Sequence, residues 1–271
     1  MAETIGFIGV GDQGGPMAHR IVDAGLPLVV WARRPEVLDS YTMKGASAAA
    51  GVAELGAQCE HVGICVFNDA DVFQITDQLI PVMEAGSRIA VHSTVLPDTV
   101  ITLERQCAEK GIMLIDAPVS GGSAAAETGT LTVMCGGRQE AFDAALPVFR
   151  TFGKKIALLG PAGSGQRAKI INNALFSAHM GIAMAGLEAG AALGIDRAQL
   201  INLIKESSGR SLGFDFFSQL TSPTAFAHHA LNLLKDINLL KSVLPDHICT
   251  HELDAASARF LAAATEPGST T

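Results

Sequence analysis

Short apolar runs alternate with segments of helical spacing along the first part of the chain, up to about Gly160. That rhythm predicts βαβ units on a parallel sheet, and therefore a doubly wound α/β domain. The expected strands are mostly apolar and are followed by polar or glycine-rich turns. They span residues 4–10, 28–31, 61–66, 88–92, 113–116, 131–135 and 155–159. Between the first two, residues 16–24 show helical spacing, and Gly25 is placed to end that helix.

The pattern changes after the glycine-rich segment 160–165, where strand-like runs stop and Ala, Leu and Ile recur at helical spacing almost to the end. We therefore expect an α/β domain over residues 1–163 and an all-helical domain over residues 164–271. Its helices are expected at residues 166–192, closed by Gly194, and at 197–206 and 231–244. The tail from Thr265 is expected to be a frayed end.

One stretch, residues 174–193, is apolar enough to suggest a membrane span. It carries His179 and Glu188 and is built from small residues as much as from large ones, so we interpret it as a buried helix of a soluble protein. His179 is then expected to be a buried, hydrogen-bonded histidine without a chemical role. At the N-terminus, Glu3 stands where a signal peptide carries positive charge, which predicts that no export signal is present.

Composition narrows the class of protein. An apolar content of 48% over 271 residues can supply a full core, and 19 basic against 27 acidic residues give a net charge of -8. That balance argues against a nucleic-acid partner. The five cysteines are scattered and odd in number, which does not suggest a disulfide framework. A reducing, cytoplasmic location and no membrane partner are expected.

A GxGxxG motif, formed by Gly9, Gly11 and Gly14, lies between the first expected strand and its helix. In this position the first glycine permits a tight turn, the second lets the backbone approach a pyrophosphate, and the third allows close packing of helix and strand. The helix N-terminus offers N–H donors and a positive dipole to the phosphates. The motif predicts a Rossmann domain that binds a dinucleotide.

Two arginines, Arg33 and Arg34, follow the second expected strand, where an NAD-preferring domain usually places an acidic residue against the ribose 2′-hydroxyl. Guanidinium groups are planar forked donors that match phosphate oxygens. The sequence therefore favours NADP. Two solvated arginines at a strand end are the alternative, and that alternative leaves NAD possible.

A candidate proton-handling residue, Lys169, stands in the first turns of the long helix, with Asn173 one turn later on the same face. The positive end of the helix dipole and partial burial in a cofactor cleft would both disfavour the ammonium form and lower the pKa. Such a lysine can give or take a proton near neutral pH. Taken alone, a lysine at a helix start is more often a solvated surface group.

Several segments resemble the motifs of the β-hydroxyacid dehydrogenase family, which includes 3-hydroxyisobutyrate dehydrogenase, tartronate semialdehyde reductase and glyoxylate/succinic semialdehyde reductases. Residues 6–18 look like its cofactor signature, in which Pro-Met-Ala follows the last glycine. Residues 116–122 are similar to its substrate-binding motif, and residues 129–137 follow at the family's spacing. Residues 165–173 match its catalytic segment, and residues 235–236 its later Lys-Asp motif. The resemblance covers nearly the whole chain in the family's order.

The resemblance implies that Lys169 is the general acid/base and that Asn173 hydrogen-bonds the substrate. It also implies that Ser120, Gly121 and Gly122 cradle the substrate's carboxylate and hydroxyl. The chemistry agrees, because a Ser-Gly-Gly turn offers a hydroxyl and exposed N–H groups without side chains that would block a small anion.

Further roles follow from the same resemblance. In the family, Lys235 lies near the nicotinamide ribose or the substrate, and Asp236 braces the domain. From residue types alone, a solvated Lys-Asp pair is equally compatible. The segment that includes Ser93 and Thr94 resembles the loop against the nicotinamide. Asn68 and Asp69 are weaker candidates for the same role.

The chain departs from the family pattern at two places. Residues 32–34 read Ala-Arg-Arg where NADP-using relatives tend to show Asn-Arg-Thr, so one polar contact to the ribose phosphate is absent. The chain is also expected to stop before the family's last helix, which usually contributes to the cleft and the dimer contact. A homodimer or a higher homo-oligomer is the expected assembly.

Other groups of polar and aromatic residues carry weaker signals. His247 and His251 stand four residues apart, but no third metal ligand is suggested nearby, so a surface pair and no metal are expected. Arg210 is a possible partner for a substrate carboxylate. The phenylalanines within residues 214–217 are expected to pack in the helical core or at the edge of its cleft.

Taken together, the sequence predicts an NADP-preferring oxidoreductase that transfers a hydride between the nicotinamide and a small β-hydroxy acid or semialdehyde. Two alternatives stay open. One is an imine reductase of the same architecture, a group that typically replaces the family lysine by Asp or Tyr. The other is a non-catalytic dinucleotide-binding module that works through protein partners.

Overall fold

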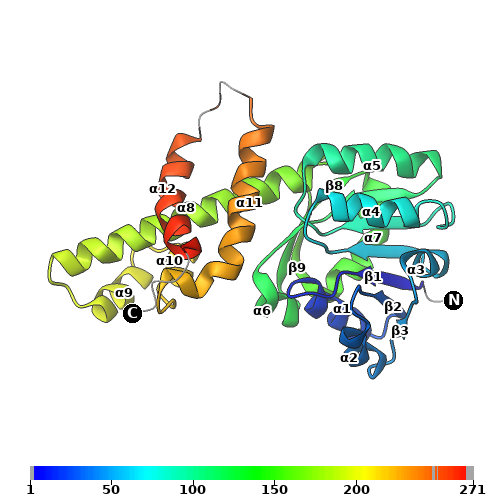
Figure 1. Ribbon diagram of the computed structural model, residues 1–271, viewed down its shortest axis with the longest axis horizontal. Helices are drawn as coiled ribbons and strands as arrows, with labels where there is room; N and C mark the ends of the chain where they lie inside the picture. Colours follow the sequence, from blue (N-terminus) through cyan, green and yellow to red (C-terminus); the bar gives the residue numbers. More distant parts are fainter. Residues whose placement is uncertain (1–2, 246–247, 249, 267–271) are drawn as a thin grey trace. The chain divides into compact units, whose positions relative to one another are not determined.

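The computed structural model describes residues 3–245, 248 and 250–266 and divides into two compact units, Met1–Lys169 and Ile170–Thr271. The first unit is α/β and the second is helical (Figure 1). The long helix α8 (Ser164–Ala192) begins in the first unit and continues into the second.

The first unit is built on one mostly parallel sheet. Its strands are β1 (Ile5–Ile8), β2 (Leu28–Trp31), β3 (Ser47–Ala48), β4 (His61–Ile64), β5 (Arg88–Val91), β6 (Met113–Asp116), β7 (Val119–Ser120), β8 (Leu131–Gly137) and β9 (Gly153–Leu158). The order is β3-β2-β1-β4-β5-β6-β8-β7, with β9 also pairing with β8. The strands from β3 to β6 are all parallel, and β8 is antiparallel to β6 and β7. The chain reverses its direction of winding between β1 and β4, which is the switch point where doubly wound sheets bind ligands.

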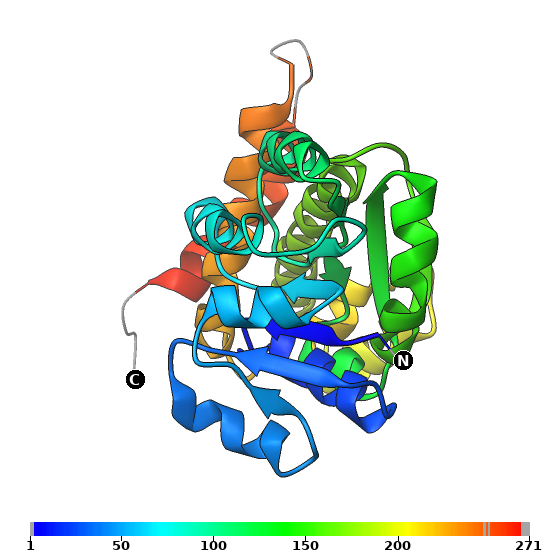
Figure 2. The same ribbon diagram turned by 90° about the vertical axis from the view of Figure 1, so that its right-hand side faces the viewer.

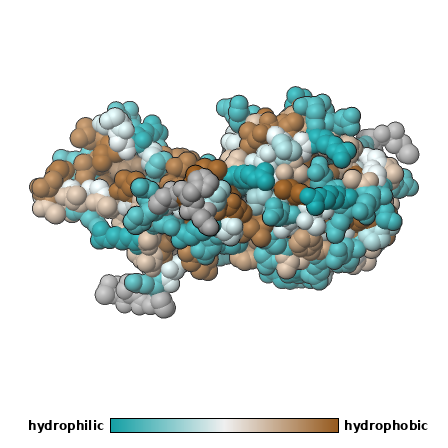
Figure 3. Space-filling model, turned by 90° about the horizontal axis from the view of Figure 1, so that it is seen from above, coloured by the Kyte–Doolittle hydropathy of each residue, from teal (hydrophilic) through white to brown (hydrophobic). Residues whose placement is uncertain are grey.

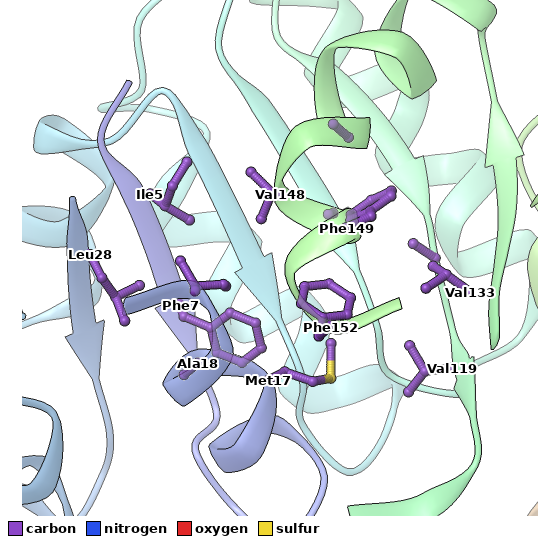
Figure 4. Close-up of a cluster of buried hydrophobic side chains, with 14 of the residues drawn as sticks. Ile5, Phe7, Met17, Ala18, Leu28, Val119, Val133, Val148, Phe149 and Phe152 are labelled. Atoms are coloured by element: carbon purple, nitrogen blue, oxygen red, sulfur yellow. The ribbon is translucent and has the colours of Figure 1, made fainter. Parts of the chain in front are cut away.

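Helices cover both faces of this sheet because successive strand residues point to opposite faces and both are apolar. In β1, Ile5 and Phe7 belong to one buried cluster, and Ile8 belongs to another. The first cluster is completed by α1 (Gly14–Asp23), α6 (Gly122–Glu127) and α7 (Gln139–Phe152), and the second by α3 (Val52–Gln58), α4 (Asp69–Leu79) and α5 (Pro97–Glu109). Figure 4 shows side chains of the first cluster, and Figure 2 gives a second view of the helices around the strands. The remaining elements, η1 (Pro35–Leu38) and α2 (Asp39–Thr42), follow β2.

The second unit packs α8 with α9 (Arg197–Lys205), α10 (Leu212–Phe217), η2 (Pro223–Phe226), α11 (Ala227–Val243) and α12 (His251–Thr265) around a separate apolar core. Among the described helices, α8 is long and apolar enough to cross a membrane, but half of that stretch is buried inside the protein. Figure 3 shows brown, hydrophobic surface gathered over the helical unit. Its exposed apolar side chains include Ile182, Leu203, Leu212 and Leu231. The expectation of a homo-oligomer stays a prediction.

The expected fold class, a doubly wound sheet followed by a helical domain, is confirmed. The sequence missed β3 and β7, which have two residues each and are too short to show a period. It also missed α10 and α12 as separate helices. The expectation that His179 is buried was wrong, because α8 has one exposed face and His179 lies on it. Of the three phenylalanines of α10, Phe214 and Phe217 are buried, whereas Phe216 is 41% exposed.

The start of α8 is fixed to the sheet by the carboxylate of Asp116, the last residue of β6. Its Oδ1 accepts a hydrogen bond from the N–H of Gly163 at 2.8 Å, and its Oδ2 accepts one from the N–H of Gln166 at 2.9 Å. Asp116 is fully buried. Gly163 directly precedes the helix and Gln166 lies in its first turn, where N–H groups have no partner within the helix. A buried carboxylate therefore serves as the cap of α8.

Two glycines make room for this contact. A Cβ atom at Gly136 would lie 2.6 Å from Oδ1 of Asp116, and a Cβ atom at Gly165 would lie 2.2 Å from the carbonyl oxygen of Met134. Neither contact can be relieved by rotating a flexible side chain. The glycines at these positions are therefore required by the close approach of α8 to β8.

Replacing Gly165→Ala should destabilise the protein by about 1–3 kcal/mol or more, because the added methyl group collides with backbone. Chemical denaturation followed by circular dichroism measures this. Gly186→Ala on the same helix is the matched control, since no atom lies within 4 Å of its Cβ position. That control should be neutral or stabilising by about 0.5–1 kcal/mol. Equal stability of both variants would contradict the close-approach argument.

Candidate active site

The glycine-rich loop lies where β1 ends and α1 begins. Gly9 has φ 93°, and a Cβ atom there would lie 2.1 Å from the carbonyl oxygen of Cys65. A Cβ atom at Gly14 would lie 2.0 Å from the carbonyl oxygen of Gly9, so both positions require glycine. Gly11 differs, because no atom lies within 4 Å of its Cβ position. Its backbone therefore faces open space, as a loop that approaches a ligand requires.

The N-terminus of α1 fits a phosphate group. The helix begins at Gly14, and its N-cap residue, Gln13, makes no side-chain capping bond. The first turn of a helix leaves N–H donors that need a partner, and its dipole favours an anion. The open backbone at Gly11 and the uncapped α1 together fit the pyrophosphate of a dinucleotide.

The loops that follow β4 and β5 are joined by hydrogen bonds at the carboxyl edge of the sheet. The N–H of Val66 donates to Oγ of Ser93 at 2.8 Å. The side chain of Asp69 accepts from the N–H of Leu96 at 2.9 Å and from Oγ1 of Thr99 at 2.6 Å. Ser93, predicted to lie against the nicotinamide, is 3% exposed, so its hydroxyl mainly holds the two loops together.

Gln166 ties the same loop to α8. Its Oε1 accepts from the N–H of Val95 at 3.1 Å, and its Nε2 donates to the carbonyl oxygen of Ser93 at 2.9 Å. Gln166 is fully buried. Sequence reasoning assigned no role to it, because its partners are 71 and 73 residues away along the chain. Thr94, between the two anchor points, is therefore carried on a loop fixed on both sides.

The two arginines after β2 have different surroundings. The guanidinium of Arg33 forms an ion pair with the carboxylate of Asp71, in the first turn of α4. Arg34 is exposed, and no described residue forms an ion pair or a side-chain hydrogen bond with it. The third candidate in this region, Asn68, is the N-cap of α4, and its Oδ1 accepts from the N–H of Asp71 at 2.9 Å. The contribution of Asp71 was not foreseen from the sequence.

The expected substrate cradle follows β6 by a short connection. Ser120 ends β7, and the next two residues, Gly121 and Gly122, have φ values of 131° and 72°. Side chains other than glycine rarely adopt these angles. The turn therefore leaves its backbone free of side chains, as the predicted binding of a small anion requires.

Lys169 lies within electrostatic reach of the carboxyl end of β4. Burial raises the pKa of the Cys65 thiol to about 12, and the positive charge of Lys169 acts in the opposite direction. Cys65 contacts both Gly9 and Gly14, as the distances to their Cβ positions show. The lysine at the start of α8 and the glycine-rich loop therefore lie in one neighbourhood of the first unit.

Asp116 is itself a titratable group close to this neighbourhood. Desolvation by burial raises its pKa from about 3.8 to about 6. The hydrogen bonds that it accepts from backbone N–H groups lower the pKa, but by less. Because its pKa is higher in the folded state, protonation of Asp116 favours the folded protein. This contribution to the free energy of unfolding is fully present below about pH 3.8, and it is lost as the pH rises through about 6. At pH 7 the carboxylate is mostly ionised, which suits its place at the positive end of α8.

Two buried histidines, His61 and His92, belong to the strands and loops behind this site. His92 follows β5 and bonds the carbonyl oxygen of Ala117 through Nδ1 at 2.8 Å. Burial lowers its pKa to about 4. Burial and the charge of Arg88 lower the pKa of His61 well below 6.5. Both rings are therefore neutral at pH 7 and pack against Phe149.

In the second unit, Asn173 and Lys235 share one buried carboxylate. Nδ2 of Asn173 donates to Oδ2 of Asp236 at 2.5 Å, and Nζ of Lys235 lies 3.5 Å from Oδ1 of Asp236. Asp236 is 3% exposed. The alternative of a solvated Lys-Asp pair is therefore wrong, and Asp236 holds the Asn173 side chain in position.

The remaining candidates are Arg210 and the pair His247 and His251. Arg210 pairs with Asp215 at 2.9 Å. His247 lies outside the described residues, so its pairing with His251 is not part of the structure. Within the described ranges, no group of three or more His, Cys, Asp or Glu side chains could hold a metal ion.

Comparisons with known proteins agree with this arrangement. Residues 4–160 match the NAD-binding domain of 6-phosphogluconate dehydrogenase, and residues 163–270 match the family described as NAD-binding of NADP-dependent 3-hydroxyisobutyrate dehydrogenase. The L-threonate dehydrogenase of Cupriavidus necator is 34% identical over 79% of this chain and 74% of its own length. The mitochondrial 3-hydroxyisobutyrate dehydrogenase of Mus musculus is 30% identical over 79% of this chain, but the match spans only 65% of that enzyme.

A solved structure shows the same fold. The 3-hydroxyisobutyrate dehydrogenase of Mycobacterium tuberculosis with L-serine superposes with a TM-score of 0.84 at 22% identity, covering 96% of this chain and 93% of that one. The two family matches, the curated relatives and the glycine-rich loop with its neighbouring lysine lead to one conclusion: the chain belongs to the β-hydroxyacid dehydrogenase family of NAD(P)-dependent oxidoreductases.

Proposed function

We propose that the protein is an NADP-preferring dehydrogenase that transfers a hydride between the nicotinamide and a small β-hydroxy acid or semialdehyde, with Lys169 as the general acid/base. The observation that carries this proposal is the position of Lys169. Its charge acts on Cys65, and Cys65 contacts the glycine-rich loop. Lys169 and the glycine-rich loop are thus neighbours within one unit.

The cofactor supplies the hydride acceptor or donor, which no amino-acid side chain provides. In the proposal, the backbone at Gly11 and the first turn of α1 bind the pyrophosphate. Arg33 and Arg34 lie where a doubly wound domain meets the ribose 2′-position, and their charge favours a 2′-phosphate. The loop that carries Thr94 is held by Gln166 and lines the same edge of the sheet.

The substrate's carboxylate and hydroxyl would bind at Ser120, Gly121 and Gly122. Lys169 would take the hydroxyl proton during oxidation and return it to the carbonyl oxygen during reduction. Asn173, one helical turn beyond Lys169, is assigned to the substrate by family resemblance, as is Lys235. Nδ2 of Asn173 donates to Asp236, and Oδ1 of Asn173 accepts from Nδ2 of Asn172 at 3.2 Å, so both ends of the amide are oriented by neighbours.

Two alternatives are less well supported. An imine reductase of the same architecture typically carries Asp or Tyr at the position of Lys169, and this chain carries the lysine. A non-catalytic dinucleotide-binding module would not need a lysine near the cofactor loop or an amide held by a buried carboxylate. The residues present favour catalysis on a substrate that reacts at a hydroxyl or carbonyl group.

Purified protein should oxidise NADPH faster than NADH with at least one of glyoxylate, succinic semialdehyde and tartronate semialdehyde. Absorbance at the reduced-nicotinamide band measures this, with each nucleotide at equal concentration. Cofactor binding without turnover on any of the three would favour the imine or non-catalytic alternatives instead.

Lys169→Ala should lower kcat by about 10²–10⁴-fold, because general acid–base catalysis contributes that much, while NADPH binding persists. Lys169→Arg keeps the positive charge but cannot release a proton, so it should be similarly impaired. Lys155→Ala, at an exposed lysine of β9, is the control and should keep wild-type kcat. Near-normal turnover of Lys169→Ala would remove this residue from the mechanism.

A further inference from the structure

Asp71 places a negative charge beside Arg33, one of the two arginines expected to bind at the 2′-position of the cofactor's ribose. Arg33 is the second residue after β2, and its guanidinium pairs with the Asp71 carboxylate. In doubly wound domains the residues just after this strand face the 2′-position of the adenosine ribose. An acidic side chain is therefore present near this position after all, supplied by α4 instead of the end of β2.

The carboxylate is the fixed member of this pair. The N–H of Asp71 donates to Oδ1 of Asn68 at 2.9 Å, which sets the first turn of α4. The Asp71 side chain is 19% exposed, whereas that of Arg33 is 64% exposed. A carboxylate in the first turn of a helix is also favoured by the helix dipole. Arg33 is thus held by a carboxylate that the fold keeps in place.

The neighbouring charged residues, Asp69 and Arg34, do not take part in the pair between Arg33 and Asp71. Asp69, also in the first turn of α4, accepts hydrogen bonds from the N–H of Leu96 and the hydroxyl of Thr99. No described residue pairs with the guanidinium of Arg34. Of the two guanidinium groups, one already has a counter-charge and the other does not.

We propose that Asp71 is a specificity-determining residue for the cofactor, which weakens the preference for NADP over NAD by neutralising Arg33. This inference rests on the proposed function, because it assumes that Arg33 and Arg34 meet the ribose 2′-position. A 2′-phosphate near Arg33 has to share the guanidinium with a fixed carboxylate of the same charge sign. A 2′-hydroxyl carries no charge and meets no such repulsion, and it can donate a hydrogen bond to a carboxylate.

An opposing effect exists and is smaller. By holding Arg33, Asp71 restricts its rotamers, which would reduce the entropy cost of phosphate binding. That gain is limited because Arg33 remains mostly exposed. Repulsion between a phosphate of charge near -2 and a carboxylate acts whatever rotamer Arg33 adopts, and it should dominate at low ionic strength. The preference for NADP over NAD then depends mainly on the charge of Arg34.

The test is a binding titration of the full chain with NADPH and with NADH, followed by nucleotide fluorescence, which does not depend on turnover. Asp71→Asn keeps the backbone N–H that donates to the capping side chain of Asn68, and removes only the charge. We expect its Kd for NADPH to fall about three- to tenfold, with the Kd for NADH changed less than about twofold. The gain should shrink as salt is raised.

Asp77→Asn is the matched control, because Asp77 is an exposed residue of the same helix with the same change in charge. It should leave the ratio of the two Kd values unchanged. In an Arg33→Gln background, Asp71→Asn should give a smaller gain for NADPH than it gives alone, because the guanidinium that it frees is gone. Thermal melting of each variant verifies that the fold is intact.

Two outcomes would overturn the inference alone. One is an unchanged ratio of Kd values in Asp71→Asn. The other is weaker NADPH binding, which would mean that Asp71 mainly orients Arg33 for the phosphate. Failure of the wild-type protein to bind either nucleotide would instead overturn the proposed function, and this inference with it.

Discussion

The buried carboxylate of Asp116 determines where the long helix α8 begins. It stands at the carboxyl end of β6, and it accepts hydrogen bonds from Gly163 and Gln166, on either side of the helix start. A buried carboxylate without donors would be strongly disfavoured, and a buried helix N-terminus without acceptors would be too. Each satisfies the other. This contact sets the position of Lys169, which follows Gln166 by less than one turn, relative to the sheet.

The rest of the site follows from the same anchoring. Once α8 starts at Asp116, Gln166 reaches the loop after β5 and holds it through Ser93 and Val95. Ser93 in turn receives the N–H of Val66 from the loop after β4. The loops after β4 and β5 and the first turn of α8 are thus joined by one connected set of hydrogen bonds. Such a set keeps loop backbones in place beside a cofactor without rigid secondary structure of their own.

The sequence predicted the sheet well because its central strands β1, β4 and β5 are fully buried and their sequences are mostly apolar. It could not predict β3 or β7, since two residues show no period. The glycines of the cofactor loop were found from spacing, and the structure shows the close contacts at Gly9 and Gly14. Contacts between distant segments were invisible, such as those of Gln166 with the loop after β5 and of Asp71 with Arg33. Residue type and spacing carry no information about which side chains meet across the fold.

Amide hydrogen exchange measures whether the carboxylate of Asp116 holds the first turn of α8. In Asp116→Asn the side-chain amide group cannot accept from both N–H donors, so the amides of Gly163 and Gln166 should exchange about tenfold faster or more. The amides of β1 and β4 should keep their wild-type rates. Unchanged exchange at Gly163 and Gln166 would mean that Asp116 does not hold the first turn and that α8 begins where it does for another reason.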